Sequence, residues 1–314
     1  LRATAQHGQH ALPGRQPLRN PGPVTVGRCR CRSTRAARAD HDGSMSLMHT
    51  TPGAELRQIG WSNLVDFWRE LAAWGGREGR FEERDGLVLH TTATSFPVTC
   101  NGVARLDPEL PAEQLLDAAD ATFSALGRGY TLQVEDPEGR DADLVAAAES
   151  RGLLELSRSP AMVRATPFDA LEPPDGVRLG WVGVDASVED FVHVADTAYQ
   201  SLGMPAGVIV EMCASQERMV APHLRSVVAF LDGRAVATAQ VLVGRGAAGV
   251  YYVGVLPEAR GRGLAELVTH AVTQVGFGLG AELVVLQATP MGEPVYRRMG
   301  FEQFQTYRGL VNFG

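Results

Sequence analysis

The segment that most constrains this chain is residues 253–265, where an apolar strand leads through a loop with two glycines directly into a helix. The predicted strand covers residues 249–256. Beyond the loop, apolar residues repeat at helical spacing, at Leu264, Leu267, Val268 and Ala271. A strand, a turn and a helix N-terminus in this order predict an anion site, because free backbone N–H groups and the helix dipole point outward there.

Side chains of the loop strengthen this prediction. Gly261 and Gly263 lack a Cβ atom, so a phosphate can approach the main chain, and Arg260 and Arg262 add charge and forked donors. A tight turn with solvated arginines is the alternative that the residues alone leave open. The loop is not a Walker A motif, since it has no Gly-Lys-Ser/Thr. It is not the dinucleotide fingerprint either, because Glu266 stands where the third Gly is needed.

The spacing Arg260-x-x-Gly263-x-Ala265 resembles the Gln/Arg-x-x-Gly-x-Gly/Ala signature of the GNAT N-acyltransferase superfamily. In that family the loop holds the pyrophosphate of acyl-CoA. A second family motif, Asn-x-x-Ala-x-x-x-Tyr-x-x-x-Gly-Phe, is similar to the segment that ends in Tyr296 and Gly300-Phe301.

The second motif departs from the family pattern at two positions. Thr289 stands where the family has Asn, and Gly292 stands where it has Ala. We expect Gly300 to end the short helix that contains Tyr296, and Phe301 to pack into the core.

The resemblance implies an α/β (α+β) fold with a mixed, mostly antiparallel central sheet flanked by helices, present in tandem. It implies acetyl-CoA as co-substrate and no metal. Backbone N–H groups where the sheet splays apart would polarise the thioester carbonyl, and Gly254 fits a kink there. Tyr296 would be the general acid that protonates the departing thiolate, since a phenol is protonated at neutral pH; an ordinary core tyrosine is the alternative. The expected cofactor-binding residues are Val253, Gly254, Val255, Arg260, Gly261, Arg262, Gly263, Leu264, Ala265 and Thr289.

The general base has no clear candidate in the sequence. Residues 246–255 contain no Asp, Glu or His. Glu211, Asp196 and His193 lie on helices expected on the acceptor side, and the remaining alternative is an amine that arrives already deprotonated.

The chain divides by pattern into four parts. Residues 1–45 form an Arg-rich tail without apolar periodicity, expected to be disordered. Residues 46–170 form a degenerate GNAT-like domain or an unrelated α/β domain, residues 171–176 form a Pro-rich linker, and residues 177–314 form the GNAT acyltransferase domain.

The ending of the first domain can be aligned with that of the second. Gly152-Leu153 corresponds to Gly300-Phe301, so that Ala148 stands where the tyrosine would be. The first domain has no Arg-x-x-Gly-x-Gly/Ala loop, which indicates a scaffold that lacks the cofactor site. Its expected elements include a strand at residues 97–100, and the second domain is expected to contain a helix over residues 208–220.

Composition sets wider limits. Four cysteines in 314 residues are no disulfide framework, and there is no apolar run of 18 residues, which fits a cytoplasmic protein without a membrane span. The tail carries eight Arg against two acidic residues. It could bind nucleic acid, which we consider unlikely; native translation starting at Met45 or Met48 is the preferred explanation of the tail.

These observations predict an acyl-CoA-dependent N-acetyltransferase that moves an acetyl or other short acyl group to a primary amine by direct attack. The acceptor would be a small molecule or a protein N-terminus, and the acidic charge of the folded part favours a cationic one. The alternative is a non-catalytic module of GNAT fold that binds CoA or a partner. The acceptor, the acyl length and the choice between monomer and homodimer are left open.

Overall fold

A computed structural model describes residues 53–135, 140–244 and 246–314. The described residues all belong to one compact unit, whose fold is given below. The expectations for residues 1–45, including a start at Met45 or Met48, lie outside the described residues.

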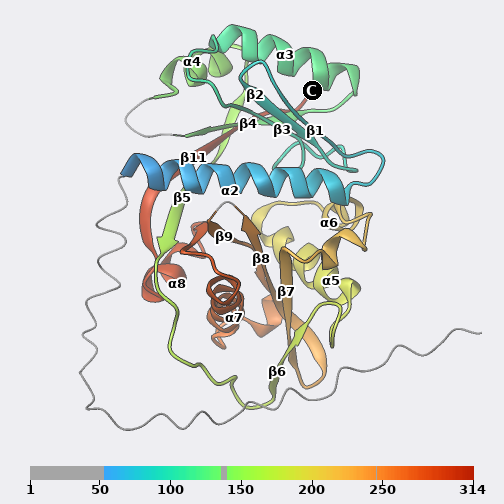
Figure 1. The fold of residues 1–314 in the computed structure, drawn as a ribbon. Coiled ribbons are helices and arrows are strands. Elements are labelled where there is room, and N and C mark those ends of the chain that lie inside the picture. Colours follow the sequence, from blue (N-terminus) through green and yellow to red (C-terminus); the bar gives the residue numbers. More distant parts are fainter. Residues whose placement is uncertain (1–52, 136–139, 245) are drawn as a thin grey trace, which may run out of the picture. The chain divides into compact units, whose positions relative to one another are not determined.

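Helices and runs of consecutive strands follow one another along the chain (Figure 1). Up to residue 164 they are α2 (Gly53–Trp74), β1 (Arg80–Arg84), β2 (Leu87–Thr91), β3 (Gly102–Arg105), α3 (Ala112–Ala125), β4 (Tyr130–Glu135), α4 (Ala142–Ser150) and β5 (Leu154–Arg164). From residue 177 they are β6 (Val177–Trp181), α5 (Val188–Tyr199), η1 (Gln200–Leu202), α6 (Val208–Met212), η2 (Arg218–Val220), β7 (Leu224–Leu231), β8 (Arg234–Gly244), β9 (Ala247–Val255), η3 (Pro257–Ala259), α7 (Leu264–Gly278), β10 (Leu283–Gln287), α8 (Glu293–Arg298) and β11 (Glu302–Asn312).

The strands of the described residues form a single eleven-stranded sheet in the order β1-β2-β3-β4-β11-β5-β10-β9-β8-β7-β6. Two neighbouring pairs are parallel, β3 with β4 and β9 with β10, and the other neighbours are antiparallel. Helices pack on this sheet, so the predicted mixed, mostly antiparallel fold is confirmed.

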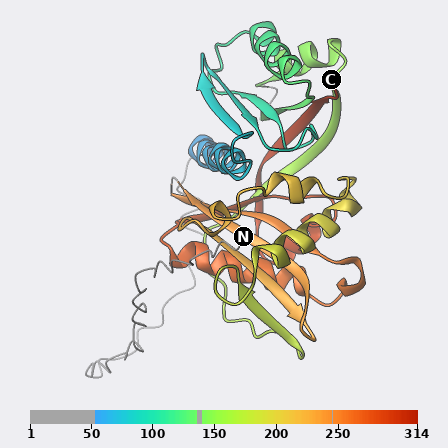
Figure 2. The ribbon, with the colours of Figure 1, turned by 90° about the vertical axis from the view of Figure 1, so that its right-hand side faces the viewer.

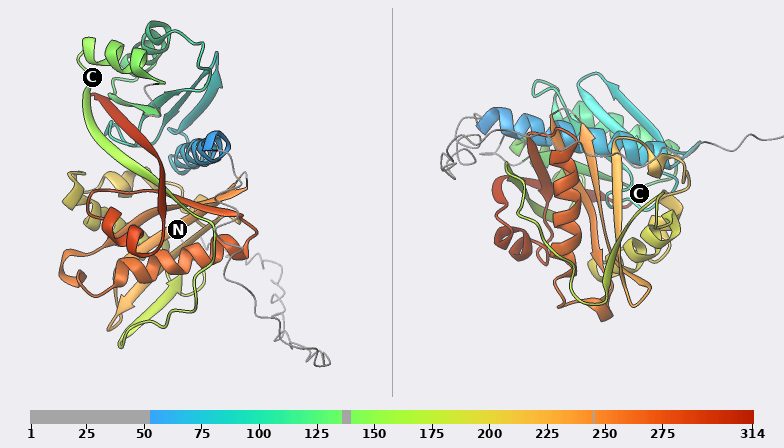
Figure 3. Two further views of the ribbon diagram at one scale, coloured as in Figure 1. Left: turned by 90° about the vertical axis from the view of Figure 1, so that its left-hand side faces the viewer. Right: turned by 60° about the horizontal axis from the view of Figure 1, so that its bottom comes forward.

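The elements up to residue 164 are called the first stretch, and those from residue 177 the second stretch. The middle of the sheet is built by an exchange of strands between these two stretches. β11, from the C-terminal end, pairs with β4 of the first stretch, whereas β5, from the first stretch, pairs with β10 of the second. β5 and β11 also pair with each other, and Figure 3 shows these two long strands running side by side. Because both stretches share one sheet, the division at residues 171–176 stays a prediction.

Two apolar layers cover the sheet. Neighbouring residues of β7 belong to different layers. Val228 packs in the layer with α2 and α5, and Val227 packs in the layer with α7. Helix α2 crosses between the strands of the first stretch and those of the second (Figures 1 and 2). It buries six large side chains against both, namely Leu64, Val65, Phe67, Trp68, Leu71 and Trp74.

The two stretches end their last helix in the same way. In α8, the N–H of Phe301 donates to the carbonyl of Tyr296 at 3.0 Å, and Gly300 has a φ of +77°. In α4, the N–H of Leu153 donates to the carbonyl of Ala148 at 3.1 Å, and the intervening glycine is again left-handed. The turn needs a residue that accepts positive φ, which glycine does without strain. This agreement supports the alignment of Ala148 with Tyr296.

Three local predictions were wrong or incomplete. Residues 97–100 form a turn instead of a strand, since the N–H of Thr99 and the carbonyl of Pro97 both bond to the side chain of Thr131. The helix expected over 208–220 is two short helices, α6 and η2. Strands β1, β3 and β11 were not anticipated.

Candidate active site

The candidate site begins where β9 separates from β10. The parallel pairing between them ends at Val250 and Leu286, whereas β8 stays paired with β9 as far as Val255. Residues 251–255 therefore have one edge that pairs with no strand among the described residues. Backbone donors on such an edge are available to a ligand.

A bulge in β9 lies at the start of this free edge. Tyr252 has a φ of +50°, and the register with β8 shifts between its pairs at Tyr251 and Gly254. The kink is therefore at Tyr252 and Val253, not at Gly254 as expected. Glycine at 254 has another cause: a Cβ atom there would lie 2.9 Å from that of Ala198, so only glycine lets α5 approach this closely.

The loop after β9 leaves its backbone open. Gly261 and Gly263 have φ values of +76° and +72°, and a Cβ atom on either would meet nothing within 4 Å. Gly263 is the N-cap of α7, whose first-turn N–H groups have no carbonyl partner inside the helix. Arg260 is fixed by two bonds, donating from Nε to the carbonyl of Val255 at 3.2 Å and from Nη2 to the hydroxyl of Ser201 at 2.8 Å.

A cavity of about 550 Å³ joins the free edge, the loop and α8. Tyr296 and all the expected cofactor-binding residues except Arg262 line it; those that do are Val253, Gly254, Val255, Arg260, Gly261, Gly263, Leu264, Ala265 and Thr289. Arg262 is exposed. The structure thus brings these residues together, and their roles stay predictions.

The ring of Tyr296 is held in the cavity wall by its own helix and by Phe301, with the two ring centroids 6.1 Å apart and edge-on. A Cβ atom at Gly292 would lie 2.8 Å from Cε2 of this ring, so the smaller residue is needed for this ring position. Thr289, the other residue that departs from the family pattern, also has a structural function. Its hydroxyl accepts a hydrogen bond from the N–H of Gly292 at the start of α8. Burial raises the pKa of Tyr296 above its ordinary value.

None of the three candidate bases lines the cavity. The carboxylate of Asp196 accepts the N–H groups of Gly207 and Ile209, at 3.0 and 3.1 Å, and so caps α6. His193 and Glu211 are exposed elsewhere.

Sequence reasoning missed much of the lining, and five of the missed residues matter most for the argument below. They are Phe67, Leu71, Thr99, Tyr199 and Tyr252. No motif contains them, and three of them come from the first stretch of chain. Burial raises the pKa of Tyr199, and the neighbouring Tyr296 adds to this effect.

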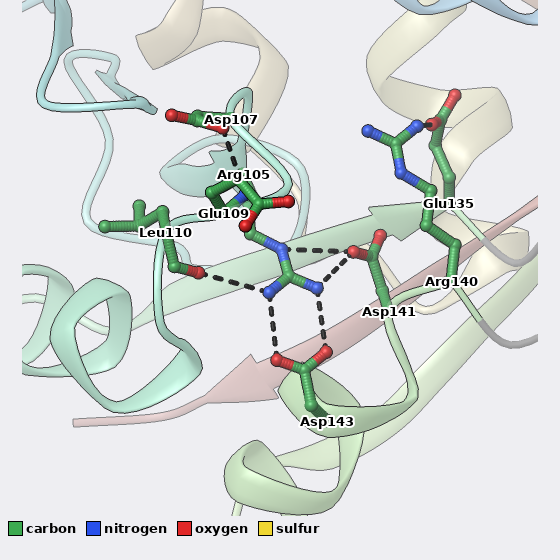
Figure 4. A network of polar contacts seen from close by, with 8 residues as sticks. All are labelled: Arg105, Asp107, Glu109, Leu110, Glu135, Arg140, Asp141 and Asp143. Carbon is green, nitrogen blue, oxygen red and sulfur yellow. Dashed lines mark hydrogen bonds and ion pairs between the residues drawn. The ribbon is translucent and has the colours of Figure 1, made fainter.

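The corresponding place in the first stretch is filled by an ion-pair network (Figure 4). Arg105, at the end of β3, is buried and bonds to both Asp141 and Asp143 at the start of α4. It also donates to the carbonyl of Leu110, just before α3, at 3.2 Å. The guanidinium thus connects β3, the segment before α3 and the start of α4. By their order in the chain, these are the counterparts of β9, the loop before α7 and α8, which line the cavity.

Comparisons with known proteins agree with this geometry. The profile of the acetyltransferase (GNAT) family matches residues 190–301. No curated protein sequence matches the chain.

Three solved structures show the same fold. A GCN5-related N-acetyltransferase from Kribbella flavida is 22% identical over 80% of this chain and 95% of its own, with a TM-score of 0.58. One from Sphaerobacter thermophilus is 16% identical over 77% and 83%, with a TM-score of 0.54. A tandem GNAT protein from the clavulanic acid biosynthesis pathway is 17% identical over 76% and 84%, with a TM-score of 0.53. Residues 190–301 therefore form a domain of the acetyltransferase (GNAT) family, and the described chain shares the fold of the solved GNAT structures.

Proposed function

We propose that this protein is an acyl-CoA-dependent N-acetyltransferase that moves an acetyl or other short acyl group to a primary amine by direct attack. The observation that carries this proposal is the single cavity in which the loop at 260–265, the unpaired edge of β9 and Tyr296 meet.

The loop has the properties that a pyrophosphate site needs. The space beside Gly261 and Gly263 is open, so phosphate oxygens can reach the main chain. First-turn N–H groups of α7 supply donors with partial positive charge, and Arg260 and Arg298 add full charges to the lining. The acyl-pantetheine arm would run from this loop back along β9.

The chemistry then falls to the splayed edge and to one phenol. Backbone N–H groups in residues 253–255 would donate to the thioester carbonyl and hold the oxyanion that forms on attack. The departing thiolate needs a proton, and Tyr296 holds one at neutral pH, since an ordinary phenol is protonated there and burial raises its pKa further. No hydrogen bond to another described residue occupies its hydroxyl.

The amine must be neutral to attack, and the cavity offers no evident base. Among the described residues that line it, the charged side chains are Arg260, Glu266 and Arg298, and Glu266 lies on α7 beside the loop. We propose that desolvation in the apolar part of the cavity favours the uncharged amine.

Location in the cytoplasm is likewise a proposal. Among the helices of the described residues, none has the length and apolar character of a membrane span.

This arrangement predicts a simple pH profile. With no enzyme base to titrate, kcat/KM for a given amine should rise about tenfold per pH unit up to the pKa of that amine in solution, about 10 for an alkyl amine. Initial rates of thiol release between pH 6 and 9 with two amines of different pKa test this. A plateau at the same pH for both amines would instead indicate an ionising group on the enzyme.

The cofactor site is tested by acetyl-CoA titration of Gly263→Trp in a calorimeter. The indole would occupy the open space at the loop, and the affinity should fall at least about tenfold, or 1.4 kcal/mol. Gly280→Trp is the matched control, because Gly280 is exposed just beyond the far end of the same helix and also has a positive φ, of +93°. Equal loss in both variants, or no binding by the parent, contradicts the proposal.

The lack of a base in the lining also favours a second candidate, a non-catalytic module that binds acyl-CoA without transferring the acyl group. It predicts the same titration results with no thiol released in the presence of any amine.

A further inference from the structure

One end of the cavity has a wall that the acetyltransferase domain does not supply. Phe67 and Leu71 of α2 and Thr99 of the turn after β2 line it. Phe67 packs against Tyr251 and Tyr252 of β9, which line the same cavity, precede residues 253–255 and are thus farther along the strand from the loop. If the loop holds the pyrophosphate, this end lies beyond the thioester, where the acceptor must enter.

Aromatic rings dominate this end. Phe67 stacks on Tyr251 with centroids 3.6 Å apart and planes 3° from parallel. Tyr252 packs between Phe67 and Tyr199, with centroid distances of 5.8 and 5.7 Å. Leu71 completes the surface.

The charged side chains of the lining come from other elements than this wall. Of the described residues in the lining, the charged ones lie on the loop, on the first turn of α7 and on α8, namely Arg260, Glu266 and Arg298. No carboxylate among them stands beside the aromatic wall. An ammonium group brought there would lose hydration without gaining a partner, which is costly.

Backbone strain marks the same end. Four described residues other than glycine have a positive φ. Asp85 and Asp232 precede glycines in hairpin turns, where aspartate tolerates that conformation. The other two are Thr99, with a φ of +62°, and Tyr252, and both line the cavity.

For a β-branched or aromatic residue such a conformation is strained and persists where the surroundings impose it. Thr99 is held by its N–H, which donates to the hydroxyl of Thr131 at 3.3 Å. Its side chain is left exposed in the lining. Strain of this kind gathers at ligand sites, so its concentration here is a second sign that this end receives a ligand.

We propose that this end is the acceptor pocket and that its substrate is a primary amine carried on an aromatic or branched aliphatic body without a second charge. The inference rests on the proposed function and makes it narrower. Phe67 and Leu71 of the first stretch bind the body, and the hydroxyl of Thr99 offers the wall a polar contact. This conclusion differs from the cationic acceptor expected from net charge, which says little about a single pocket.

The test compares 2-phenylethylamine with 1,4-diaminobutane as acceptors for the full chain, with thiol release from acetyl-CoA as the readout. The parent should prefer the aromatic amine by at least about tenfold in kcat/KM, the size of effect that apolar contacts supply. A preference for the diamine, or transfer to neither amine, overturns the inference.

Thr99→Asp and Thr99→Asn form a matched pair, because both residues tolerate positive φ and differ in charge. The Asp variant should lose the preference for the aromatic amine by about tenfold or more relative to the Asn variant. An unchanged ratio in the Asp variant places the acceptor elsewhere and overturns the inference.

Acetyl-CoA affinity separates the two levels of failure. It should stay within about twofold of the parent in both Thr99 variants, which also shows that they fold. If acetyl-CoA binds and is transferred to the diamine, the proposed function stands and only the acceptor class is wrong. If acetyl-CoA does not bind the parent, the proposed function itself fails.

Discussion

Replacing Tyr296 with Phe is expected to lower kcat by about 10²–10⁴-fold, the usual contribution of a positioned general acid. The substitution removes one oxygen from a ring whose position is fixed by Gly292 and Phe301. Acetyl-CoA affinity measured by calorimetry should therefore stay within about twofold of the parent. Because burial raises the pKa of Tyr296, the phenol stays protonated between pH 6 and 9, and the parent should show no alkaline loss of activity in that range.

Tyr199→Phe is the matched control for this experiment. Tyr199 lines the same cavity, and Tyr296 lies close enough to raise the pKa of Tyr199. No family motif contains Tyr199. We expect its kcat to change less than about tenfold. If Tyr199→Phe loses activity and Tyr296→Phe does not, the acid has been assigned to the wrong ring. If neither loses activity, the thiolate departs without a phenolic acid.

The parts of the site that could be predicted are those encoded in contiguous sequence. Gly261 and Gly263 leave the loop open through their own left-handed backbone conformation. Gly300 ends its helix through the same local property. Local conformations of this kind appear in the sequence as a short pattern of glycines and charged residues. For this reason the proposed cofactor loop and Tyr296 could be identified from the sequence.

The wall that we propose for the acceptor could not be predicted, because its residues meet only after folding. Phe67 and Thr99 each lie more than 150 positions before Tyr251 and Tyr252, which line the same cavity, and each looks like an ordinary core or turn residue in sequence. Likewise, β11 pairs with β4, which precedes it by about 170 residues. No periodicity within either strand specifies that partner.

The exchange of β5 and β11 gives a physical reason for keeping a first stretch that lacks a cofactor loop. Because β11 follows α8, which carries Tyr296, and pairs with β4, the segment after the proposed acid is built into the strands of the first stretch. Helix α2 contributes both to that packing and to the cavity wall through Phe67. A first stretch that supplies a wall does not need a site of its own.

Arg105→Met is expected to destabilise the protein by about 3–5 kcal/mol, the usual cost of removing one partner from a buried ion pair. Nη2 of Arg105 lies 2.5 Å from Asp141, and the two side chains are 5% and 10% exposed. Without the guanidinium, the carboxylate of Asp141 and the carbonyl of Leu110 lose a buried donor. Urea denaturation followed by circular dichroism measures the loss.

Two further variants decide whether the cost comes from the unpaired carboxylate. In Arg105→Met/Asp141→Leu most of the lost stability should return, since apolar pairs often replace buried ion pairs without penalty. Asp143→Asn should cost at most about 1 kcal/mol, because Asp143 is 55% exposed. A double variant as unstable as Arg105→Met would contradict this account and would mean that the guanidinium matters mainly through its bond to Leu110 and its packing against α4.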